Sequence, residues 1–462
     1  MKALILTGIL AGVALANGAP FRDGERAALY GDSVTHHGYY VKPLQDFYYT
    51  RFPEADIHIW NCGVGGETAG EAIRRFEVDI ASRQPTFVSV LFGQNDVGVV
   101  GYQTNAPDWA VSQRTNAVKN FSANMRIIQG LLRERLPHAQ VTWCTLVPWD
   151  DELKFKKPRG PITGVTAGER PLCDFVTALQ REAGGGYIDF YAPMLAYNRK
   201  LHAQDPYTSL SPDTIHPREP GGLFMTQLFL RSQGVDGCVS DVVLDAAAGK
   251  ATRVQNADVA NCARTLAGGL IFLLKEKALP FPVEPAAKEL AADVGFDAEF
   301  NRETLAVTGL AEGRWTLRID GTNNVLTASA AAWAKGVNLA LCEATPMMAQ
   351  ARRVAALNAE KCAKEKAVRD MWVARCVAFR RMQWEVGLKM ADYADDSWAT
   401  AFIHGFLNAC GKEPHKDRAL YANYAKNWRS RDRMEREIEE LHRRIRQINR
   451  PSAHTFELAP AN

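Results

Sequence analysis

Five short apolar segments, separated by longer amphipathic stretches, run through the first half of this chain. The stretches between them, such as 67–82 and 113–136, have the spacing of helices with one apolar face. Strands that alternate with helices of this length favour a parallel sheet covered by helices on both faces. The sequence therefore predicts a three-layer α/β domain over residues 19–236. Its expected strands are 27–30, 55–61, 86–92, 140–147 and 186–190.

Two further regions are predicted after this domain. Residues 237–342 contain short alternating segments and turns; in 314–319 the apolar residues Trp315, Leu317 and Ile319 share one face, and Asp320-Gly321 follows as a turn. This pattern favours a β-sandwich, with a loop-plus-helix insertion at 280–301. Residues 343–462 are rich in helix formers and predict a helical C-terminal region.

The last predicted helix carries an apolar stripe at alternating spacings of four and three. The stripe covers about two heptads, which is short for a coiled coil. Packing of this helix on its own chain is favoured, and a homodimer through the helix is the alternative. The stripe consists of Met434, Ile438, Leu441, Ile445 and Ile448.

The N-terminus resembles a secretory signal. Lys2 is followed by an apolar run over 3–13 and by Ala14-Leu15-Ala16, a small-x-small cleavage site. The run is too short to cross a bilayer. We expect a signal peptide at 1–18, export to the periplasm or the extracellular space, and no stable membrane insertion.

Composition narrows the function classes. A chain of 462 residues is longer than one hydrophobic core usually serves, so more than one domain is expected. Its 55 basic and 52 acidic residues leave a net charge of +3, which gives no reason to expect nucleic acid as a binding partner. The 9 cysteines have no zinc-like spacing. An odd number leaves at least one free thiol, and disulfides among the others stay open.

Four polar segments lie at strand ends or before a helix, where parallel α/β sheets place their sites. A serine hydroxyl needs an adjacent base to become a nucleophile, and His216 can serve as that base. Asp213, three residues earlier, can orient the imidazole and stabilise its charged form. The segments are Gly31-Asp32-Ser33, Asn61-Cys62-Gly63-Val64-Gly65-Gly66, Gly93-Gln94-Asn95-Asp96 and Asp213-Thr214-Ile215-His216-Pro217.

In this order and spacing, the four segments resemble the signature blocks of the SGNH (GDSL-type) hydrolase family, over about residues 25–235. The resemblance implies a flavodoxin-like fold and a catalytic triad of Ser33, His216 and Asp213. It also implies an oxyanion hole formed by the backbone N–H groups of Ser33 and Gly66 and the side-chain amide of Asn95. Such an enzyme needs no metal or organic cofactor.

Three further residues are weaker candidates for substrate binding. His36 follows the nucleophile closely, and Tyr102 and Trp109 lie in the loop predicted at 97–113. Loops of this length without regular structure are often functional. Anchoring of the loop, or a purely structural role, is the alternative for each of the three.

We therefore expect an exported serine esterase that removes O-acyl groups, chiefly acetyl, from carbohydrates. Its partner would be a small-molecule or polysaccharide ester. A lipid, lysophospholipid or general carboxylesterase is one alternative. A non-catalytic glycan-binding protein with a vestigial site is an alternative of another class.

Overall fold

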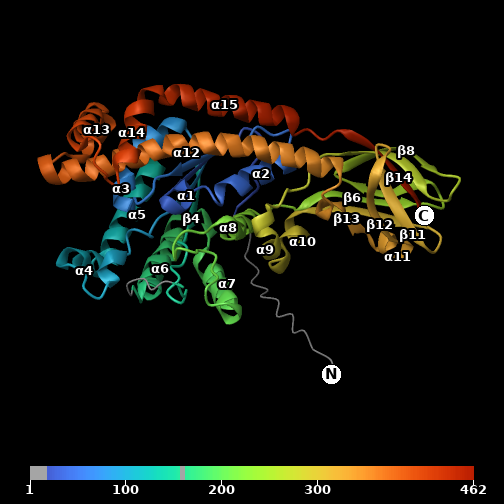
Figure 1. Ribbon diagram of the computed structural model, residues 1–462, viewed down its shortest axis with the longest axis horizontal. Coiled ribbons are helices and arrows are strands. Elements are labelled where there is room, and N and C mark those ends of the chain that lie inside the picture. Colours follow the sequence, from blue (N-terminus) through green and yellow to red (C-terminus); the bar gives the residue numbers. More distant parts are fainter. Residues whose placement is uncertain (1–17, 157–161, 462) are drawn as a thin grey trace.

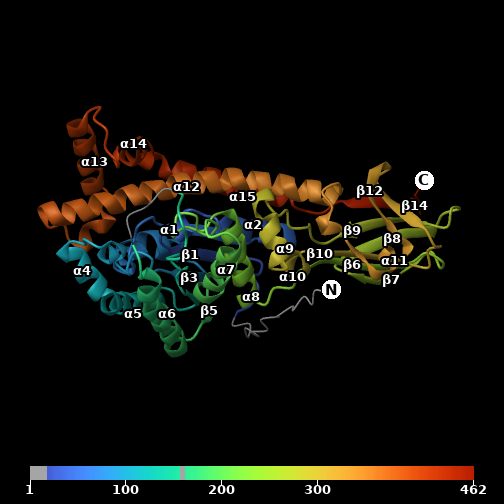
Figure 2. The same cartoon turned by 60° about the horizontal axis from the view of Figure 1, so that its bottom comes forward.

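The computed structural model describes residues 18–156 and 162–461, so the signal peptide predicted at 1–18 lies almost wholly outside the described residues. The molecule is elongated, with an α/β domain at one end and β-sheets at the other (Figure 1). Helix α12 (Pro346–Val386) runs along the molecule from the α/β domain to these sheets, with α15 (Arg431–Ile448) beside it (Figure 2).

The α/β domain contains one five-stranded sheet in which every pairing is parallel. The strand order is β2-β1-β3-β4-β5. This confirms the predicted parallel α/β fold. The strands are β1 (Arg26–Gly31), β2 (His58–Gly63), β3 (Phe87–Leu91), β4 (Gln140–Cys144) and β5 (Gly186–Ile188).

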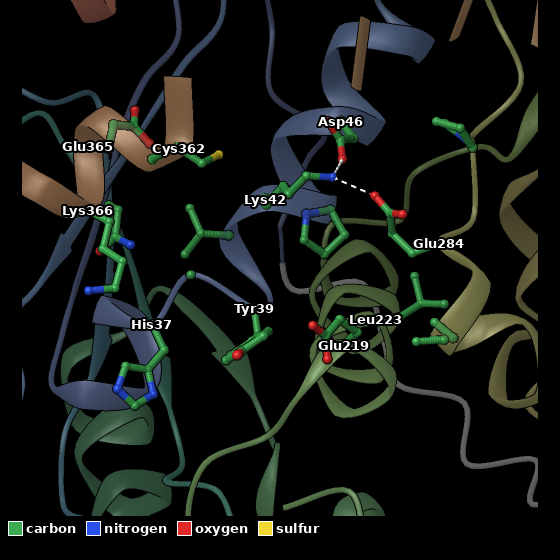
Figure 3. A pocket seen from close by; sticks show the side chains of 18 of the residues that line it. His37, Tyr39, Lys42, Asp46, Glu219, Leu223, Glu284, Cys362, Glu365 and Lys366 are labelled. Atoms are coloured by element: carbon green, nitrogen blue, oxygen red, sulfur yellow. Dashed lines mark hydrogen bonds and ion pairs between the residues drawn. The ribbon is translucent and has the colours of Figure 1, made fainter. Parts of the chain in front are cut away.

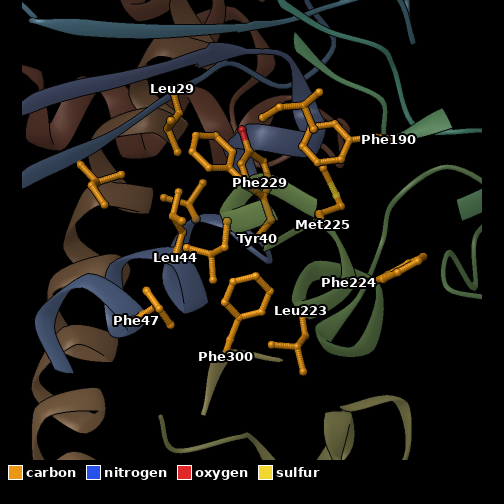
Figure 4. Packing of buried hydrophobic residues seen from close by; sticks show 14 of the residues in the cluster. Leu29, Tyr40, Leu44, Phe47, Phe190, Leu223, Phe224, Met225, Phe229 and Phe300 are labelled. Carbon is orange, nitrogen blue, oxygen red and sulfur yellow. The ribbon is translucent and has the colours of Figure 1, made fainter. Parts of the chain in front are cut away.

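Helices cover both faces of this sheet because successive strand side chains point to opposite sides. In β1, Ala27 and Leu29 join one buried cluster, whereas Ala28 and Tyr30 join the other. Helices α2 and α8 contribute to the first cluster (Figure 4), and α5 and α6 to the second. The bounds are α2 (Val41–Arg51), α8 (Glu219–Ser232), α5 (Ala117–Arg135) and α6 (Val165–Ala183).

The connections of this domain differ from two expectations. The stretch 67–82 is not one helix, since a π turn interrupts it where the buried Arg75 pairs with Glu67 and Asp79. The predicted loop 97–113 contains regular structure. These segments comprise α3 (Ala69–Ala72), η1 (Ile73–Arg75), η2 (Phe76–Ile80), η3 (Ala81–Arg83), η4 (Val99–Tyr102) and α4 (Asp108–Thr115); α1 (Ser33–His36) and α7 (Tyr191–Gln204) complete the domain.

A β-sandwich follows, as predicted. One sheet has the order β13-β10-β6-β7 and the other β12-β11-β14-β9-β8. Apolar side chains from both sheets, among them Val242 and Phe272, share one core. The strands are β6 (Cys238–Asp245), β7 (Lys250–Gln255), β8 (Ala257–Arg264), β9 (Leu270–Glu276), β10 (Arg302–Thr308), β11 (Arg314–Ile319), β12 (Thr322–Ser329) and β13 (Val337–Asn338).

The insertion expected at 280–301 packs on the α/β domain rather than within the sandwich. Phe281, Phe296 and Phe300 belong to the buried cluster that α2 and α8 line. The insertion thus joins the two domains through shared apolar contacts. It contains η5 (Pro285–Ala287), α9 (Lys288–Asp293) and α10 (Phe296–Phe300), and α11 (Ala330–Lys335) and η6 (Leu339–Leu341) lie further along.

The C-terminal region is helical, but its assignment up to residue 462 is wrong at the end. Residues Ala453–Pro460 form strand β14, which pairs with β9 on one side and β11 on the other. Phe456 and Leu458 are buried at a spacing of two, as a strand requires. The helices are α12, η7 (Met390–Ala394), α13 (Ser397–Cys410), α14 (Arg418–Asn427), η8 (Trp428–Ser430) and α15.

The apolar stripe of α15 faces its own chain. Leu441 and Ile445 are buried, Met434 and Ile438 pack against the cluster that α12, α13 and α14 form, and only Ile448 is exposed. Helices α12 and α15 lie side by side (Figures 1 and 2). Packing on its own chain, the favoured prediction, thus accounts for four of the five stripe residues, and the described residues give no support to a homodimer through this helix.

The state of the cysteines and the character of the helices bear on two predictions, the possible disulfides and the absence of stable membrane insertion. All nine cysteines lie in the described part of the chain, and each is a free thiol. Within residues 18–156 and 162–461, no helix combines the length and the apolar character needed to span a bilayer.

A buried ion cluster around Asp79 joins α12 to the α/β domain. Arg369 of α12 donates to both carboxylate oxygens of Asp79 at 2.7 Å and to the carbonyl of Gly63 at 2.9 Å. Arg75 donates to Asp79 at 2.6 Å and to Glu67 at 2.8 Å. Burial alone would raise the pKa of Asp79, but the charges and hydrogen bonds of Arg369 and Arg75 hold that pKa well below its usual range.

Replacing Arg369 tests this junction. Arg369→Met should lower the free energy of unfolding by about 3 kcal/mol, because it leaves buried carboxylate charge undercompensated. Denaturant unfolding followed by circular dichroism measures the change. Arg353→Met is the matched control, since Arg353 lies exposed on the same helix. Equal unfolding midpoints for the two variants would contradict the anchoring role.

Candidate active site

The end of β1 places Ser33 at the carboxyl edge of the sheet. Helix α1 begins directly after the strand, and Asp32 caps it by accepting a hydrogen bond from the backbone N–H of Val34 at 3.0 Å. The neighbouring strand β2 approaches closely at Gly63. A Cβ atom there would lie 2.1 Å from the backbone nitrogen of His36, so this strand end requires glycine.

A tight loop before α8 carries the proposed base. Asp213 accepts hydrogen bonds from the backbone N–H groups of Ile215 at 3.2 Å and His216 at 2.7 Å. Between them Thr214 has a φ of +83°, a left-handed conformation that costs a β-branched residue about 1–3 kcal/mol. The two hydrogen bonds thus fix Asp213 and His216 in one orientation, although Thr214 between them adopts a strained backbone conformation.

Ser33, His216 and Asp213 form one hydrogen-bonded chain. The distance from Ser33 Oγ to His216 Nε2 is 2.9 Å, and that from His216 Nδ1 to Asp213 Oδ2 is 2.8 Å. Partial burial would raise the pKa of Asp213, but the ring and backbone hydrogen bonds of His216 hold it well below its usual range. A carboxylate that stays ionised can stabilise a positively charged imidazole.

The predicted oxyanion residues lie on two loops that contact each other. Gly66 has a φ of +78°. Asn95 donates from Nδ2 to the carbonyl of Glu67 at 2.8 Å, which leaves its second amide N–H for a ligand. Asp96 accepts from the backbone N–H of Ala69 with both oxygens at 3.1 Å. Asn95 and Asp96 thus hold the Gly66 loop from one side.

Helix α12 holds the same loop from the other side. Arg380 donates to the carbonyl of Gly66 and forms an ion pair with Glu71. No motif of the first half of the chain predicts this contact, because Arg380 lies about 300 residues further on. The sequence showed only a long run of helix-forming residues in this region.

His36 and His37, which follow Ser33, make different contacts, and His37 was not among the predicted site residues. His36 Nε2 contacts Asp370 of α12 at 2.9 Å, so His36 links the loop to that helix. The ring of His37 lies 4.5 Å from the ring of His216. Burial, and then the charge of His216, lowers the pKa of His37 to about 4, so it is neutral at pH 7.

Tyr102 and Trp109 do not line the cavity beside these histidines. Tyr102 packs its hydroxyl against Gly168 and its ring under the guanidinium of Arg114 at 5.2 Å. Trp109 is 60% exposed on α4. These contacts anchor Tyr102 in its segment. Substrate binding stays a prediction for His36, Tyr102 and Trp109, and of the three His36 lines the cavity described next.

A cavity of about 540 Å³ opens next to His37 (Figure 3). Its walls come from the segment from His36 to Asp46, the insertion from Phe281 to Ala287, and residues Cys362 to Lys366 of α12, together with Asn61 of β2 and Glu219 and Leu223 of α8. The size is typical of small-molecule sites. Both accessory regions therefore contribute walls to a cavity beside His37, the residue whose ring lies next to that of His216.

Two buried carboxyl groups under the site favour the protonated form. The Oδ2 atom of Asp32 has no hydrogen-bond partner among the described residues, and burial raises the pKa of Asp32 to about 7. Burial likewise raises the pKa of Asp96 to about 8. Since an unfolded aspartate has a pKa of 3.8, the native state binds protons more tightly between these values.

Asp32 should therefore make the protein less stable as the pH rises. From pH 4 to pH 8 its ionisation should remove about 4 kcal/mol from the free energy of unfolding. Asp32→Asn keeps the cap on Val34 and cannot ionise, so its stability relative to the wild type should rise by this amount. Denaturant unfolding at each pH measures it, with exposed Asp258→Asn as control. Parallel pH profiles for the wild type and Asp32→Asn would refute the assignment.

Comparisons with known proteins agree with this geometry. Residues 29–222 match the GDSL-like lipase/acylhydrolase family. An acetylxylan esterase of Geobacillus stearothermophilus is 23% identical over 231 residues, which are 46% of this chain and 95% of that protein. The solved structure of BT4096, described as a gut microbial diltiazem-metabolizing enzyme, is 28% identical with a TM-score of 0.84, covering 96% of this chain and 99% of that one.

The family match spans the strand ends and loops that carry Ser33, Gly66, Asn95, Asp213 and His216. The similarity to the solved enzyme extends beyond the α/β domain to the sandwich and the helical region. Residues 29–222 therefore form an SGNH (GDSL-like) hydrolase domain, and the chain is an ester-bond hydrolase.

Proposed function

We propose that this protein is an exported serine esterase that removes short acyl groups, chiefly acetyl, from hydroxyl groups of carbohydrates. The observation that carries the proposal is the hydrogen-bonded chain from Ser33 Oγ through His216 to Asp213, at 2.9 and 2.8 Å. The chain begins at the carboxyl edge of the sheet, where α/β enzymes bind substrate.

Acyl transfer would proceed in two steps. His216 takes the proton of Ser33 as Oγ attacks the ester carbonyl, and then donates it to the departing alcohol oxygen. The acyl group remains on Ser33. Water then attacks this acyl-enzyme, with His216 again taking a proton, and the carboxylic acid leaves as Ser33 recovers its hydroxyl.

The oxyanion formed in each step needs donors that are in place beforehand. The backbone N–H groups of Ser33 and Gly66 and the remaining amide N–H of Asn95 are our candidates. Loss of one such donor typically costs about 10²–10³-fold in rate. The contacts of Arg380 and Asp96 to this loop support the proposal, because they fix the donor positions.

Two observations support an acetylated carbohydrate as substrate. Nearly the whole length of the acetylxylan esterase, 95%, matches a part of this chain that makes up 46% of it. The N-terminal signal expected at 1–18 would deliver the enzyme to the compartment where polymeric glycans occur. A lipid esterase and a vestigial binding protein are the alternatives that the first experiment below separates.

The cavity beside His37 favours a second candidate for the alcohol. Its walls include Val41, Leu223 and Phe281, which suit a bulky apolar alcohol better than a sugar. One solved structure, which covers 96% of this chain, is described as a diltiazem-metabolizing enzyme. An acetyl ester of such an alcohol is therefore our second candidate substrate.

Replacing the nucleophile tests the reaction. Ser33→Ala should lower kcat for p-nitrophenyl acetate by at least about 10⁴-fold, because no other hydroxyl replaces Oγ. Release of p-nitrophenol measures the loss. Ser209→Ala provides a control hydroxyl outside the proposed triad. Activity in Ser33→Ala equal to the wild type would exclude the mechanism, and an inactive wild type would support a binding protein. A preference for acyl chains of eight carbons or more would favour the lipid alternative.

Filling the cavity tests the alcohol. Ala363→Trp places a large ring against the cavity wall, so the ratio of kcat/KM for diltiazem to that for p-nitrophenyl acetate should fall at least about tenfold. Ala356→Trp, on an exposed position of the same helix outside the cavity, should leave the ratio unchanged. A selective loss on acetylated xylo-oligosaccharides would instead assign the cavity to the carbohydrate. Unchanged ratios for both substrates would show that the cavity is not an alcohol site.

A further inference from the structure

Three metal-ligating side chains from distant parts of the chain meet on the side of the α/β domain that α15 covers. Asp56 and His58 lie at the start of β2, and His442 lies on α15. One carboxylate oxygen and one ring nitrogen from each histidine lie within 4.8 Å of one another. We propose that Asp56, His58 and His442 bind a divalent transition-metal ion, with zinc the best fit, and that this ion fastens α15 to the α/β domain.

The alternation of strand side chains brings the first two ligands together. Ile57 is buried in the core of the domain, whereas the side chains of Asp56 and His58, on either side of it, are partly exposed and face α15. His442 approaches from α15, and its ring stacks on that of His58 with centroids 4.0 Å apart. Both rings direct Nε2 toward the same oxygen, Oδ1 of Asp56.

The spacing of these atoms suits zinc. Oδ1 of Asp56 lies 2.9 Å from Nε2 of His442 and 3.5 Å from Nε2 of His58. Tetrahedral ligands at the usual zinc distances of about 2.0–2.1 Å lie about 3.3 Å apart, between these two values. Two imidazoles and a carboxylate form a nitrogen and oxygen set that zinc accepts. Water can complete the coordination because the Asp56 side chain is 43% exposed.

The outer nitrogens of both rings meet partners of the kind that metal-ligating histidines have. Nδ1 of His442 lies 2.7 Å from the hydroxyl of Tyr49, and Nδ1 of His58 lies 3.7 Å from a carboxylate oxygen of Glu439. Such contacts orient a ring so that its other nitrogen faces the ion. In the described structure the His58 ring makes no hydrogen bond, so its Nε2 is free for an ion.

The surrounding charges allow a divalent ion. Arg446 contacts the other oxygen of Asp56, Oδ2, at 3.2 Å and leaves Oδ1 for the ion. Lys361 lies 5.9 Å from the ring of Tyr49. Arg26 also acts on His58, and the carboxylates of Asp56 and Glu439 oppose the charges of these three cations.

The position of the cluster points to a structural role. His58 begins β2, and the opposite end of this strand, Gly63, adjoins the Ser33 site. Five residues of extended strand separate the two by about 17 Å. An ion at Asp56 therefore acts on the attachment of α15 and not on the ester.

Zinc binding by the full-length chain tests the proposal. Protein dialysed against chelator is titrated with ZnCl₂ by calorimetry, and its thermal unfolding is followed with and without zinc. In the wild type we expect a site that raises Tm by about 5 °C at saturating zinc. His58→Gln and His442→Gln should each weaken zinc binding at this site at least about 100-fold and abolish the rise in Tm.

A variant that is expected to fold and a matched control variant separate the loss of zinc binding from a general loss of stability. The half-buried His58 ring makes no hydrogen bond to any described residue, so His58→Gln should fold even if His442→Gln does not. His454→Gln is the control, because His454 contacts the single carboxylate of Asp320, at 2.6 Å, in the sandwich, and it should keep the full zinc response. A wild type without zinc-dependent stabilisation, or a His58→Gln variant that responds like the wild type, would overturn the proposal.

Discussion

The buried carboxylate of Asp79 is the contact on which the arrangement of the site depends. Arg75 and Arg369 both pair with it, and each also donates to a strand-end carbonyl, Gly31 for Arg75 and Gly63 for Arg369. These two carbonyls belong to the ends of β1 and β2 from which the catalytic loops start. A charge of this kind is costly to bury unless it is paired from several sides. One carboxylate thus couples the strand ends to the attachment of α12.

The helical region consequently takes part in the site itself. Arg380 contacts the carbonyl of Gly66, Asp370 contacts His36, and Ala363 lines the cavity. The segment from Phe281 to Ala287, which leaves the sandwich, supplies the facing wall. The proposed catalytic residues lie within the family match at residues 29–222, whereas part of the wall of the cavity beside them comes from regions outside it. Differences in these regions can change the substrate without changing the reaction.

The sequence predicted what depends on local pattern. Period-two and helical spacing indicated the parallel sheet and the sandwich, and the four motifs indicated Ser33, Gly66, Asn95, Asp213 and His216. Contacts between distant segments carry no such pattern. The contacts of Arg369 and Arg380, and the approach of the His37 ring to His216, depend on how α12 and α8 pack against the rest of the chain. A single sequence does not show that packing. Strand β14 was missed because eight residues after a long helix give too short a signal against a helical background.

The position of β14 has a consequence for the time course of folding. This strand lies between β9 and β11 in its sheet. Until the ribosome has synthesised β14, β9 and β11 each have one unpaired edge. Residues Ala453–Pro460 follow the whole helical region, more than a hundred residues after β11 ends at Ile319. At a synthesis rate of about 5–20 residues per second, these edges stay open for roughly ten to thirty seconds. Open edges recruit other strands, so the nascent sandwich is the part of this molecule most exposed to aggregation and most dependent on chaperones.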